Sequence, residues 1–458
     1  MLHTHPIVAL ATPVGMGAIG VIRLSGVGAI ELADAVFKGK RLSKQASHTA
    51  HVGLVTDKDG TPIDQVVATI FRTPRSYTGQ DTVEISCHGS NYILQRVMER
   101  LVSEGAQLAQ AGEFTLRAFL NGKMDLSQAE AVADLIASEN EAMRRIALLQ
   151  MRSGFASQLS ELRQQLVQFA ALIELELDFS TEDVEFADRR QLRALVEQIR
   201  HVLYPLIASF RLGNVIKNGV HTVIAGRPNA GKSTLLNALL NEERAIVSPI
   251  AGTTRDTIEE ILHIEGMAFR LIDTAGIREA NDAIEQMGVQ KTMEKIGQAT
   301  VLLYVFDAST LPLDDVGKDL EKLHRNNLTT LVIANKADQL HTPKLPQNIF
   351  PNDFLLVSAK EQTGLGELRA ALCEAATGKQ IAIGKNEMLL TNVRHYEALS
   401  QADKALDAIV GGIDTQRSSE LIAQDLRTAL DYIGQITGDT ITNDEVLGNI
   451  FSKFCIGK

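Results

Sequence analysis

Cysteine is scarce in this chain of 458 residues, which contains only Cys87, Cys373 and Cys455. The three lie far apart, are odd in number and form no Cys-x-x-Cys pair. This spacing argues against a disulfide framework and against a zinc site. Isolated thiols fit a reducing compartment, so we expect a cytoplasmic protein.

Long apolar runs are also missing. No stretch approaches the roughly 18 consecutive apolar residues that a membrane-spanning helix needs, so we expect no membrane association. A short apolar run covers residues 7–11, but no basic lead-in precedes it and no long hydrophobic region follows. These features argue against a secretory signal peptide.

An excess of basic residues is the third absence. Lys and Arg together number 45 and Asp and Glu 56, which gives a net charge of −11. A protein that binds nucleic acid mainly through phosphates is usually basic, so an RNA partner must meet a local patch or bind transiently. Apolar residues make up 45% and charged residues 22%, which is ordinary for a folded protein, and the length predicts about three domains.

The first 120 or so residues predict a mixed α/β domain with turn signals between its elements. Strand-like runs occupy residues 7–11, 19–24, 65–71 and 82–86, and helices are expected at residues 29–37 and 91–103.

Helical periodicity begins near Leu126 and continues to about Ile207. Apolar residues recur there at steps of three and four, which predicts the buried face of a long helix. They are Leu159, Leu162, Leu166, Phe169 and Ile173. Residues 180–183 interrupt this helix, another covers about 190–210, and the pattern returns between residues 386 and 436. We infer that the two helical stretches form one discontinuous domain.

The chain between these helical stretches predicts a doubly wound α/β sheet, because short apolar runs alternate with helical segments. The strand-like runs are Val220–Ala225, Phe269–Asp273, Val301–Asp307, Leu331–Asn335 and Phe354–Ser358.

A phosphate-binding motif follows the first of these strands. Residues 226–233 match GxxxxGK[ST] and open a helix that continues through Thr234. Backbone N–H groups of such a loop, with the helix N-terminus, surround a β-phosphate. Lys232 would reach the β- and γ-phosphates, and the Ser233 hydroxyl would bind Mg²⁺. The expected nucleotide contacts of this loop are Asn229, Ala230, Gly231, Lys232, Ser233 and Thr234.

Three further motifs follow in order, each at the end of a strand. They are Asp273-Thr274-Ala275-Gly276, Asn335-Lys336-Ala337-Asp338 and Ser358-Ala359-Lys360. Asp273 would hold Mg²⁺, directly or through water, and the Gly276 N–H would donate to the γ-phosphate. Asp338 offers two carboxylate oxygens to the guanine N1–H and amino group, a choice of guanine over adenine by roughly 10²–10⁴. These segments predict a GTP-hydrolysing enzyme that binds GTP and GDP.

The segment between the motifs lacks a water-orienting glutamine. Ile277 stands where Ras-like proteins carry that glutamine, and it has no donor or acceptor. Glu279, Asp282 and Glu285 are candidates for positioning the water. Thr254, within residues 252–256, can add a hydroxyl to Mg²⁺ as part of a switch segment. No arginine is placed as a finger, and a bound monovalent cation could supply that charge.

The whole chain resembles the bacterial tRNA-modification GTPases of the MnmE or TrmE family. The motifs that carry the resemblance lie at both ends of the chain as well as in the GTPase segment. They are Ala11-Thr12-Pro13, Gly20-Val21-Ile22-Arg23-Leu24-Ser25-Gly26, Tyr77-Thr78-Gly79 with Glu84, Gly112-Glu113-Phe114-Thr115, Arg117 to Lys123, and Phe454-Cys455-Ile456-Gly457-Lys458.

For the GTPase segment the resemblance implies a K⁺ site beside the phosphates. Asn229 would bind K⁺ through its side chain, with the carbonyls of Ser248, Ile250 and Thr253. Ser233 and Thr254 would bind Mg²⁺, Glu285 would orient water and Arg278 would support it. The implied nucleotide contacts include Ser248, Pro249, Ile250, Ala251, Gly252, Thr253 and Thr254. K⁺ would also favour pairing of two such modules in a homodimer.

For the rest of the chain the resemblance implies folate binding and RNA chemistry. The N-terminal domain would dimerise and bind a 5-formyl-tetrahydrofolate-type cofactor through Arg23, Glu84, Lys123 and Lys458. Methylene-tetrahydrofolate would be a possible one-carbon donor. Cys455 would reach the folate region. The reaction would be a carboxymethylaminomethyl-type addition at C5 of the wobble uridine (position 34) of certain tRNAs, shared with a flavin-dependent MnmG (GidA)-type partner.

The implied domains are an N-terminal α+β domain at 1–122, a helical domain at 123–213 and 381–458, and an inserted Ras-like GTPase domain at 214–380. Two other interpretations were weighed. Residues 15–20 match GxGxxG, but a strand-like run follows where a dinucleotide fold needs a helix. A regulatory or ribosome-assembly GTPase without modification chemistry fits the GTPase motifs equally well, and folate binding separates it from the modification enzyme.

Overall fold

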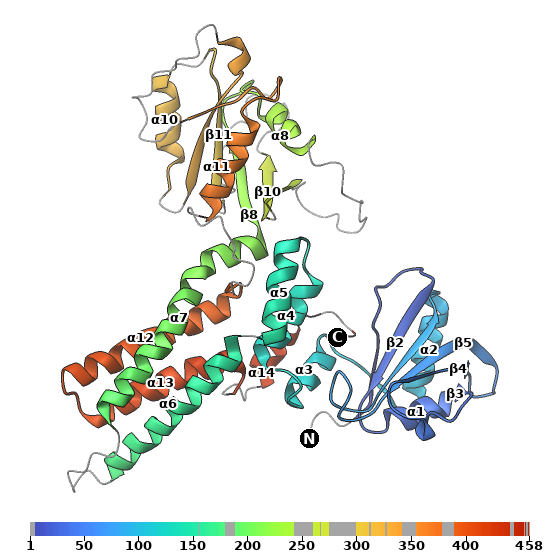
Figure 1. The fold of residues 1–458 in the computed structure, drawn as a ribbon. Coiled ribbons are helices and arrows are strands. Elements are labelled where there is room, and N and C mark those ends of the chain that lie inside the picture. The colour runs from blue at the N-terminus through green and yellow to red at the C-terminus, as the bar shows by residue number, and fades with distance from the viewer. Residues whose placement is uncertain are drawn as a thin grey trace. The chain divides into compact units, whose positions relative to one another are not determined.

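The fold is known from a computed structural model in which two compact units can be described (Figure 1). The described residues are 5–153, 155–178, 188–241, 260–265, 267–273, 299–310, 313–325, 328–340, 354–377, 389–439, 444–452, 454 and 457. The first unit comprises Met1–Ala137, Ala147–Arg200 and Gln401–Lys458, and the second Ser138–Ile146 and His201–Ser400. Of the helices described, none is both long and apolar enough to span a bilayer.

The N-terminal part of the first unit is a seven-stranded sheet in the order β3-β4-β5-β6-β2-β1-β7. Its strands are β1 (Ile7–Leu10), β2 (Ile19–Ser25), β3 (Phe37–Lys38), β4 (Thr49–Thr56), β5 (Pro62–Phe71), β6 (Thr82–His88) and β7 (Gln107–Leu108). Helices α1 (Ala29–Val36) and α2 (Asn91–Ser103) pack on the sheet through one hydrophobic cluster. Strand β5 has one buried face, because Val66, Ala68 and Ile70 alternate with more exposed residues and successive side chains of a strand point to opposite sides.

The expected strands and helices of this region are confirmed, whereas strands β3, β4 and β7 and helix α3 (Glu113–Leu120) were not predicted. A strand follows residues 15–20, which removes the dinucleotide-fold interpretation. Strand β4 was not predicted although its sequence alternates, and its apolar residues Ala50, Val52 and Leu54 lie on the exposed face. Helix α3 is short and begins after a glycine in the left-handed conformation, without a side-chain cap.

Helices from both ends of the chain form the rest of the first unit, as the periodicity predicts. Helix α6 (Phe155–Asp178) packs along α13 (Ser419–Thr437), and Arg163 donates to the carbonyl of Leu430 at 3.2 Å. Arg200 of α7 (Arg189–Asn218) donates to Asp403 of α12 (Val393–Asp414) at 2.9 Å. The interruption expected at residues 180–183 lies outside the described residues.

Shorter helices complete this packing. Phe451 of α14 (Asp444–Phe451) and Phe454 lie in one hydrophobic cluster with residues of α3 and α4 (Leu126–Ile136). The two phenyl rings are 5.0 Å apart. Helix α5 (Glu141–Ser153) begins in the second unit after Asn140, whose side chain accepts from the Met143 amide, and only its residues from Ala147 onward belong to the first unit. Phe451 and Phe454 are therefore anchored by apolar contacts within the first unit.

The second unit contains the predicted doubly wound sheet, in the order β13-β12-β11-β8-β10-β9. Its strands are β8 (Val220–Ala225), β9 (Glu260–Ile264), β10 (Met267–Asp273), β11 (Val301–Asp307), β12 (Thr329–Asn335) and β13 (Leu355–Leu356). Strand β9 pairs antiparallel with β10, and the remaining neighbours pair parallel. Strand β13 is shorter than the predicted run.

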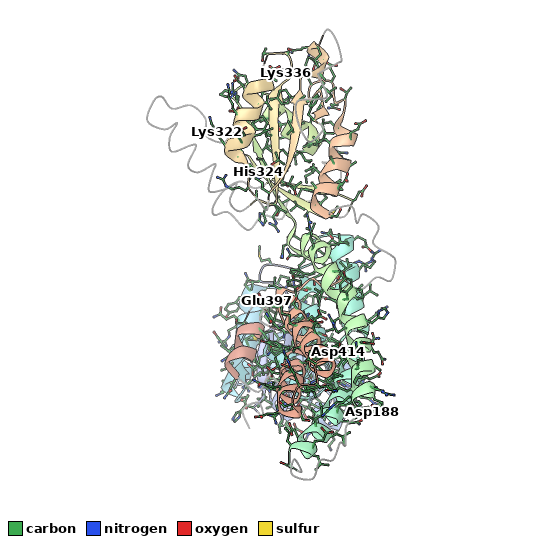
Figure 2. All side chains as sticks on the ribbon, turned by 90° about the vertical axis from the view of Figure 1, so that its left-hand side faces the viewer. Asp188, Lys322, His324, Lys336, Glu397 and Asp414 are labelled. Atoms are coloured by element: carbon green, nitrogen blue, oxygen red, sulfur yellow. The ribbon has the colours of Figure 1, made fainter. Side chains whose placement is uncertain are left out.

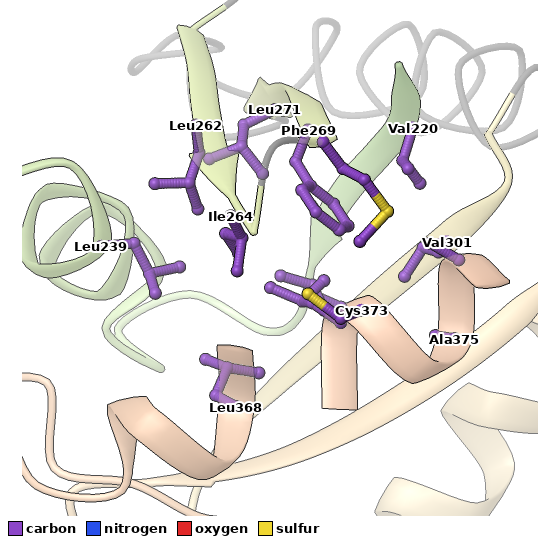
Figure 3. Packing of buried hydrophobic residues seen from close by; sticks show 14 of the residues in the cluster. Val220, Leu239, Leu262, Ile264, Phe269, Leu271, Val301, Leu368, Cys373 and Ala375 are labelled. Carbon is purple, nitrogen blue, oxygen red and sulfur yellow. The ribbon is translucent and has the colours of Figure 1, made fainter. Parts of the chain in front are cut away.

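Helices cover both faces of this sheet. On one face, α8 (Lys232–Asn241) and α11 (Leu365–Thr377) pack on Val301, Leu303 and Val305, and Figure 3 shows this core around Phe269 and Cys373. On the other face, α10 (Leu313–Leu323) contributes Val316 to a cluster with Tyr304 and Phe306. Burial on both faces explains the continuous apolar run of β11.

Candidate nucleotide and folate sites

The described nucleotide segments, at residues 226–234, 335–338 and 358–360, follow the carboxyl ends of strands in the second unit's sheet. Strand β8 pairs parallel with β10 and with β11, and β11 pairs parallel with β12. The carboxyl ends of β8, β10 and β12 therefore point the same way. Figure 2 shows Lys336, directly after β12, at the end of this unit opposite to His324, which precedes β12. Ligands of open α/β sheets bind outside the carboxyl ends of the strands.

The phosphate loop approaches its neighbours closely, which explains its glycines. Gly226 has φ 149°, and a Cβ built there would lie 2.0 Å from the carbonyl oxygen of Val305. Gly231 has φ 88°, and its Cβ would lie 2.3 Å from Nδ2 of Asn335. Asn229 has φ 62°, in the left-handed region, and its side chain is exposed. The loop is thus shaped by backbone contacts that side chains would block.

Lys232 folds back over the loop. Its Nζ donates to the carbonyls of Gly226 at 2.8 Å and Arg227 at 3.0 Å. Ser233 and Thr234 are exposed in the first turn of α8, where the helix dipole favours an anion. An ammonium group, two hydroxyls and the N–H groups of the first turn of a helix are the donor set that a phosphate chain with Mg²⁺ requires.

Asn335 joins the phosphate loop to the last motif. It is 2% exposed, its Nδ2 donates to the carbonyl of Ala230 at 2.9 Å, and its Oδ1 accepts from the Ala359 amide at 3.1 Å. A buried side chain with both ends satisfied fixes two loops against each other. Asn335 therefore connects the phosphate loop to the Ser358-Ala359-Lys360 motif, although the two are distant in sequence.

Two residues of the predicted guanine-binding motif, Lys336 and Asp338, form hydrogen bonds with neighbouring side chains. Oδ1 of the exposed Asp338 accepts from the Ser358 hydroxyl at 2.6 Å. Lys336 has φ 63°, and its Nζ donates to Asp307 at 2.6 Å. Burial opposes ionisation of Asp307, but hydrogen bonds from Lys336 and Ser309 outweigh it and lower its pKa. Lys360 is exposed beside Glu361, at 3.4 Å.

Other predicted site residues lie outside the described residues. They are Ser248, Pro249, Ile250, Ala251, Gly252, Thr253, Thr254, Thr274, Ala275, Gly276, Arg278, Glu285, Cys455 and Lys458. Asp273 ends strand β10, where its backbone pairs with that of Ile224 in β8.

A second cluster forms on the N-terminal sheet around Arg23. Strands β2 and β6 pair Arg23 with Glu84. Arg23 Nε donates to Glu84 Oε1 at 2.9 Å, and Nη2 forms an ion pair with the same oxygen at 2.8 Å. Its carbon Cζ lies 5.5 Å from the ring centre of Tyr77 and 5.7 Å from that of Phe114. The faces of these two rings attract the guanidinium cation. Both residues belong to motifs that carry the family resemblance, but the sequence did not predict them as neighbours of Arg23.

The C-terminal segment reaches the same arginine. Arg23 Nη1 donates to the carbonyl of Gly457 at 3.2 Å. Gly457 has φ 96°, and a Cβ there would lie 2.3 Å from the Leu10 carbonyl oxygen. Only glycine fits so close to strand β1. The described neighbour of Cys455 and Lys458 therefore contacts a predicted folate residue.

Lys123, the third described folate candidate, lies against the loop that carries Tyr77. Its Nζ donates to the Pro74 carbonyl at 3.0 Å, and its side chain is next to Gly79, where a Cβ would meet its Cγ at 3.2 Å. Burial raises the pKa of Tyr77, whose hydroxyl is 2.8 Å from Thr115 Oγ1.

Comparison with known proteins matches both ends of the chain to family descriptions. The "MnmE helical domain" matches residues 126–455, and "GTP-binding protein TrmE N-terminus" matches residues 6–123. A protein of Cytophaga hutchinsonii named tRNA modification GTPase MnmE is 52% identical over 456 residues, covering 100% of this chain and 98% of its own.

A protein of the same name from Flavobacterium psychrophilum is 53% identical over 470 residues, covering 100% of both chains. Among solved structures, Aquifex aeolicus Era bound to GDP and AlF₄⁻ is 26% identical, with a TM-score of 0.26. It covers 41% of this chain and 66% of that one.

Proposed function

We propose that this chain, which belongs to the MnmE family of tRNA modification GTPases, couples K⁺-stimulated GTP hydrolysis to modification of the wobble uridine of certain tRNAs at C5. A flavin-dependent partner of the MnmG type shares the reaction, and the chain works as a homodimer in the cytoplasm. The observation that carries the proposal is the contact between Arg23 and the carbonyl of Gly457. It places Gly457, the one described residue of the C-terminal Cys-Ile-Gly-Lys sequence, beside Arg23.

In the GTPase domain, this chain's residues supply binding and orientation. Lys232 and the first turn of α8 would bind the phosphates, and Ser233 with Thr254 and Asp273 would serve Mg²⁺. Asn229, with the carbonyls of Ser248, Ile250 and Thr253, would bind K⁺. A bound cation supplies positive charge to the transferred phosphoryl group. Glu285 would orient water, supported by Arg278.

The described residues fit a K⁺ ion in two respects. Asn229 is exposed in the phosphate loop, and its side chain carries an amide oxygen of the kind that binds hard cations. Arg227, the arginine of the same loop, donates to two carboxylates, so its charge is already offset. The positive charge for the transition state must therefore come from another group.

On the N-terminal sheet, Arg23 and Glu84 would bind the folate, together with Lys123 and Lys458. The guanidinium suits the glutamate carboxylates and Glu84 suits the pterin donors. The cofactor would be of the 5-formyl-tetrahydrofolate type, with methylene-tetrahydrofolate as the one-carbon donor. We propose domain limits of 1–122, 123–213 with 381–458, and 214–380.

Replacement of Cys455 tests the link from the GTPase to the RNA product. Cys455→Ser should abolish wobble-uridine modification while GTP turnover stays unchanged, because the thiol lies outside the GTPase domain. The measurement is mass spectrometry of tRNA from cells that carry only the variant, with Cys373→Ser as control. Cys373 is buried in α11, where burial raises its pKa to about 11. Normal modification by Cys455→Ser would remove this thiol from the chemistry.

Replacement of Arg23 tests the folate site. Arg23→Met should weaken binding of 5-formyl-tetrahydrofolate by about 10–10², because charge-assisted hydrogen bonds are lost. Calorimetry of the full chain measures it, and Arg41→Met is the control, since Arg41 is exposed and its nearest carboxylate is 3.9 Å away. Equal affinities in all three proteins would remove Arg23 from the folate site, whereas no binding by the wild type would favour a ribosome-assembly or regulatory GTPase.

A further inference from the structure

Arg227, the second residue of the phosphate loop, points to helix α10 instead of the phosphate side. Its Nε donates to Asp319 Oδ2 at 2.8 Å, and its Nη2 lies 3.4 Å from Oδ1 of the same carboxylate. Its Nη1 donates to Asp315 at 3.3 Å. A guanidinium bound by both oxygens of one carboxylate is fixed in direction as well as position.

Tyr304 connects this pair to the sheet. Its hydroxyl donates to Asp319 Oδ2 at 2.7 Å, and its side chain is 1% exposed in β11. Hydrogen bonds from Arg227 and Tyr304 lower the pKa of Asp319, and burial raises that of Tyr304. Asp319 is therefore an ionised acceptor between a rigid strand and the phosphate loop. Figure 1 shows α10 beside β11.

The backbone of Arg227 takes part in the nucleotide site. Its carbonyl accepts from Lys232 Nζ at 3.0 Å and from the Ala230 amide at 3.4 Å. Asn229 follows two residues later in the left-handed conformation. Arg227 therefore links helix α10, through its side chain, to Lys232, through its carbonyl. This link sets the position of the phosphate loop relative to α10.

We propose that Asp319, with Tyr304, positions Arg227 so that the phosphate loop presents Asn229 and Lys232 in the geometry that K⁺-stimulated hydrolysis requires. This inference rests on the proposed K⁺-stimulated function. Asp319 and Arg227 are positioning residues, because neither is placed on the nucleotide itself. The network differs from an isolated surface ion pair in having a buried strand hydroxyl as its third member.

Asp319→Asn tests the proposal, because asparagine keeps the shape of the side chain and removes its charge. The K⁺ concentration for half-maximal GTP turnover should rise about 5-fold and kcat should fall about 10-fold, since small misplacements of reacting groups are costly. GDP affinity should stay within about 2-fold of the wild type, because most nucleotide contacts remain. Tyr304→Phe, which removes a single hydroxyl, should shift the K⁺ requirement in the same direction by less.

Glu321→Gln is the matched control. Glu321 is an exposed carboxylate of the same helix that takes no part in the Arg227 network, so the same change from acid to amide should leave both kinetic values unchanged. A lower melting temperature in Asp319→Asn with an unchanged K⁺ requirement would mean a structural role alone and would overturn the proposal. A rise in KM for GTP alone would do the same. Equal wild-type rates in K⁺ and Na⁺ would instead refute the proposed K⁺ function itself.

Discussion

GTP turnover by this protein should be about 10–10³ times faster in KCl than in NaCl at equal ionic strength, and Asn229→Ala should remove most of that difference. The expected factor is below the 10³–10⁵ of an arginine finger, because a single ion lacks the guanidinium's hydrogen bonds. The left-handed Asn229 projects from a loop whose own arginine is bound to Asp319. Lys232 is then the one cationic side chain of residues 226–233 that can serve the phosphates.

Phosphate release under single-turnover conditions measures this effect without interference from product release. Asn218→Ala is a suitable control, since Asn218 is an exposed asparagine of the same unit whose amide bonds Asn214 at 2.6 Å. Rates that are the same in both salts, together with full activity of Asn229→Ala, would rule out the K⁺ site. A K⁺ effect that survives Asn229→Ala would assign the ion to other ligands.

Asp338→Asn should weaken GDP binding by about 10²–10⁴ and create affinity for XDP. The carboxylate can accept two hydrogen bonds from the guanine N1–H and amino group, whereas asparagine has one acceptor and one donor group. Xanthine has a carbonyl oxygen where guanine has the amino group, so the asparagine amide can donate to it. The substitution therefore changes which base is complementary instead of merely deleting a contact.

Calorimetric titration with GDP and XDP measures the change. Ser358→Ala is the informative comparison, because it removes the 2.6 Å hydrogen bond to Asp338 and leaves both carboxylate oxygens. Its loss of GDP affinity should be about 10-fold, the usual worth of one hydrogen bond to a charged group. Unchanged GDP affinity in Asp338→Asn would mean that this carboxylate does not meet the base.

Much of the GTPase domain could be predicted from sequence, because its signals are local. The motif at residues 226–233 needs only a preceding strand and a following helix, and both are visible as an apolar run and a helical pattern. Strands β8 and β11 were found because burial on both faces makes them continuously apolar. Strand β4 was not predicted because its apolar residues lie on the exposed face, while Thr49, His51 and Gly53 lie on the other. Helix α3 was not predicted because no capping side chain marks its start.

The sequence alone determined the kind of chemistry: a phosphate loop, a guanine-selective carboxylate and the motifs that imply a folate site. Only the tertiary structure decided which of these residues meet. Arg23 and Gly457 are 434 positions apart, and Arg227 and Asp319 are 92 apart. The reason is physical: backbone conformation and periodicity depend on neighbours along the chain, whereas a side chain's partner depends on how strands and helices pack. An arginine bound to a distant carbonyl or carboxylate has the same local sequence as an exposed one.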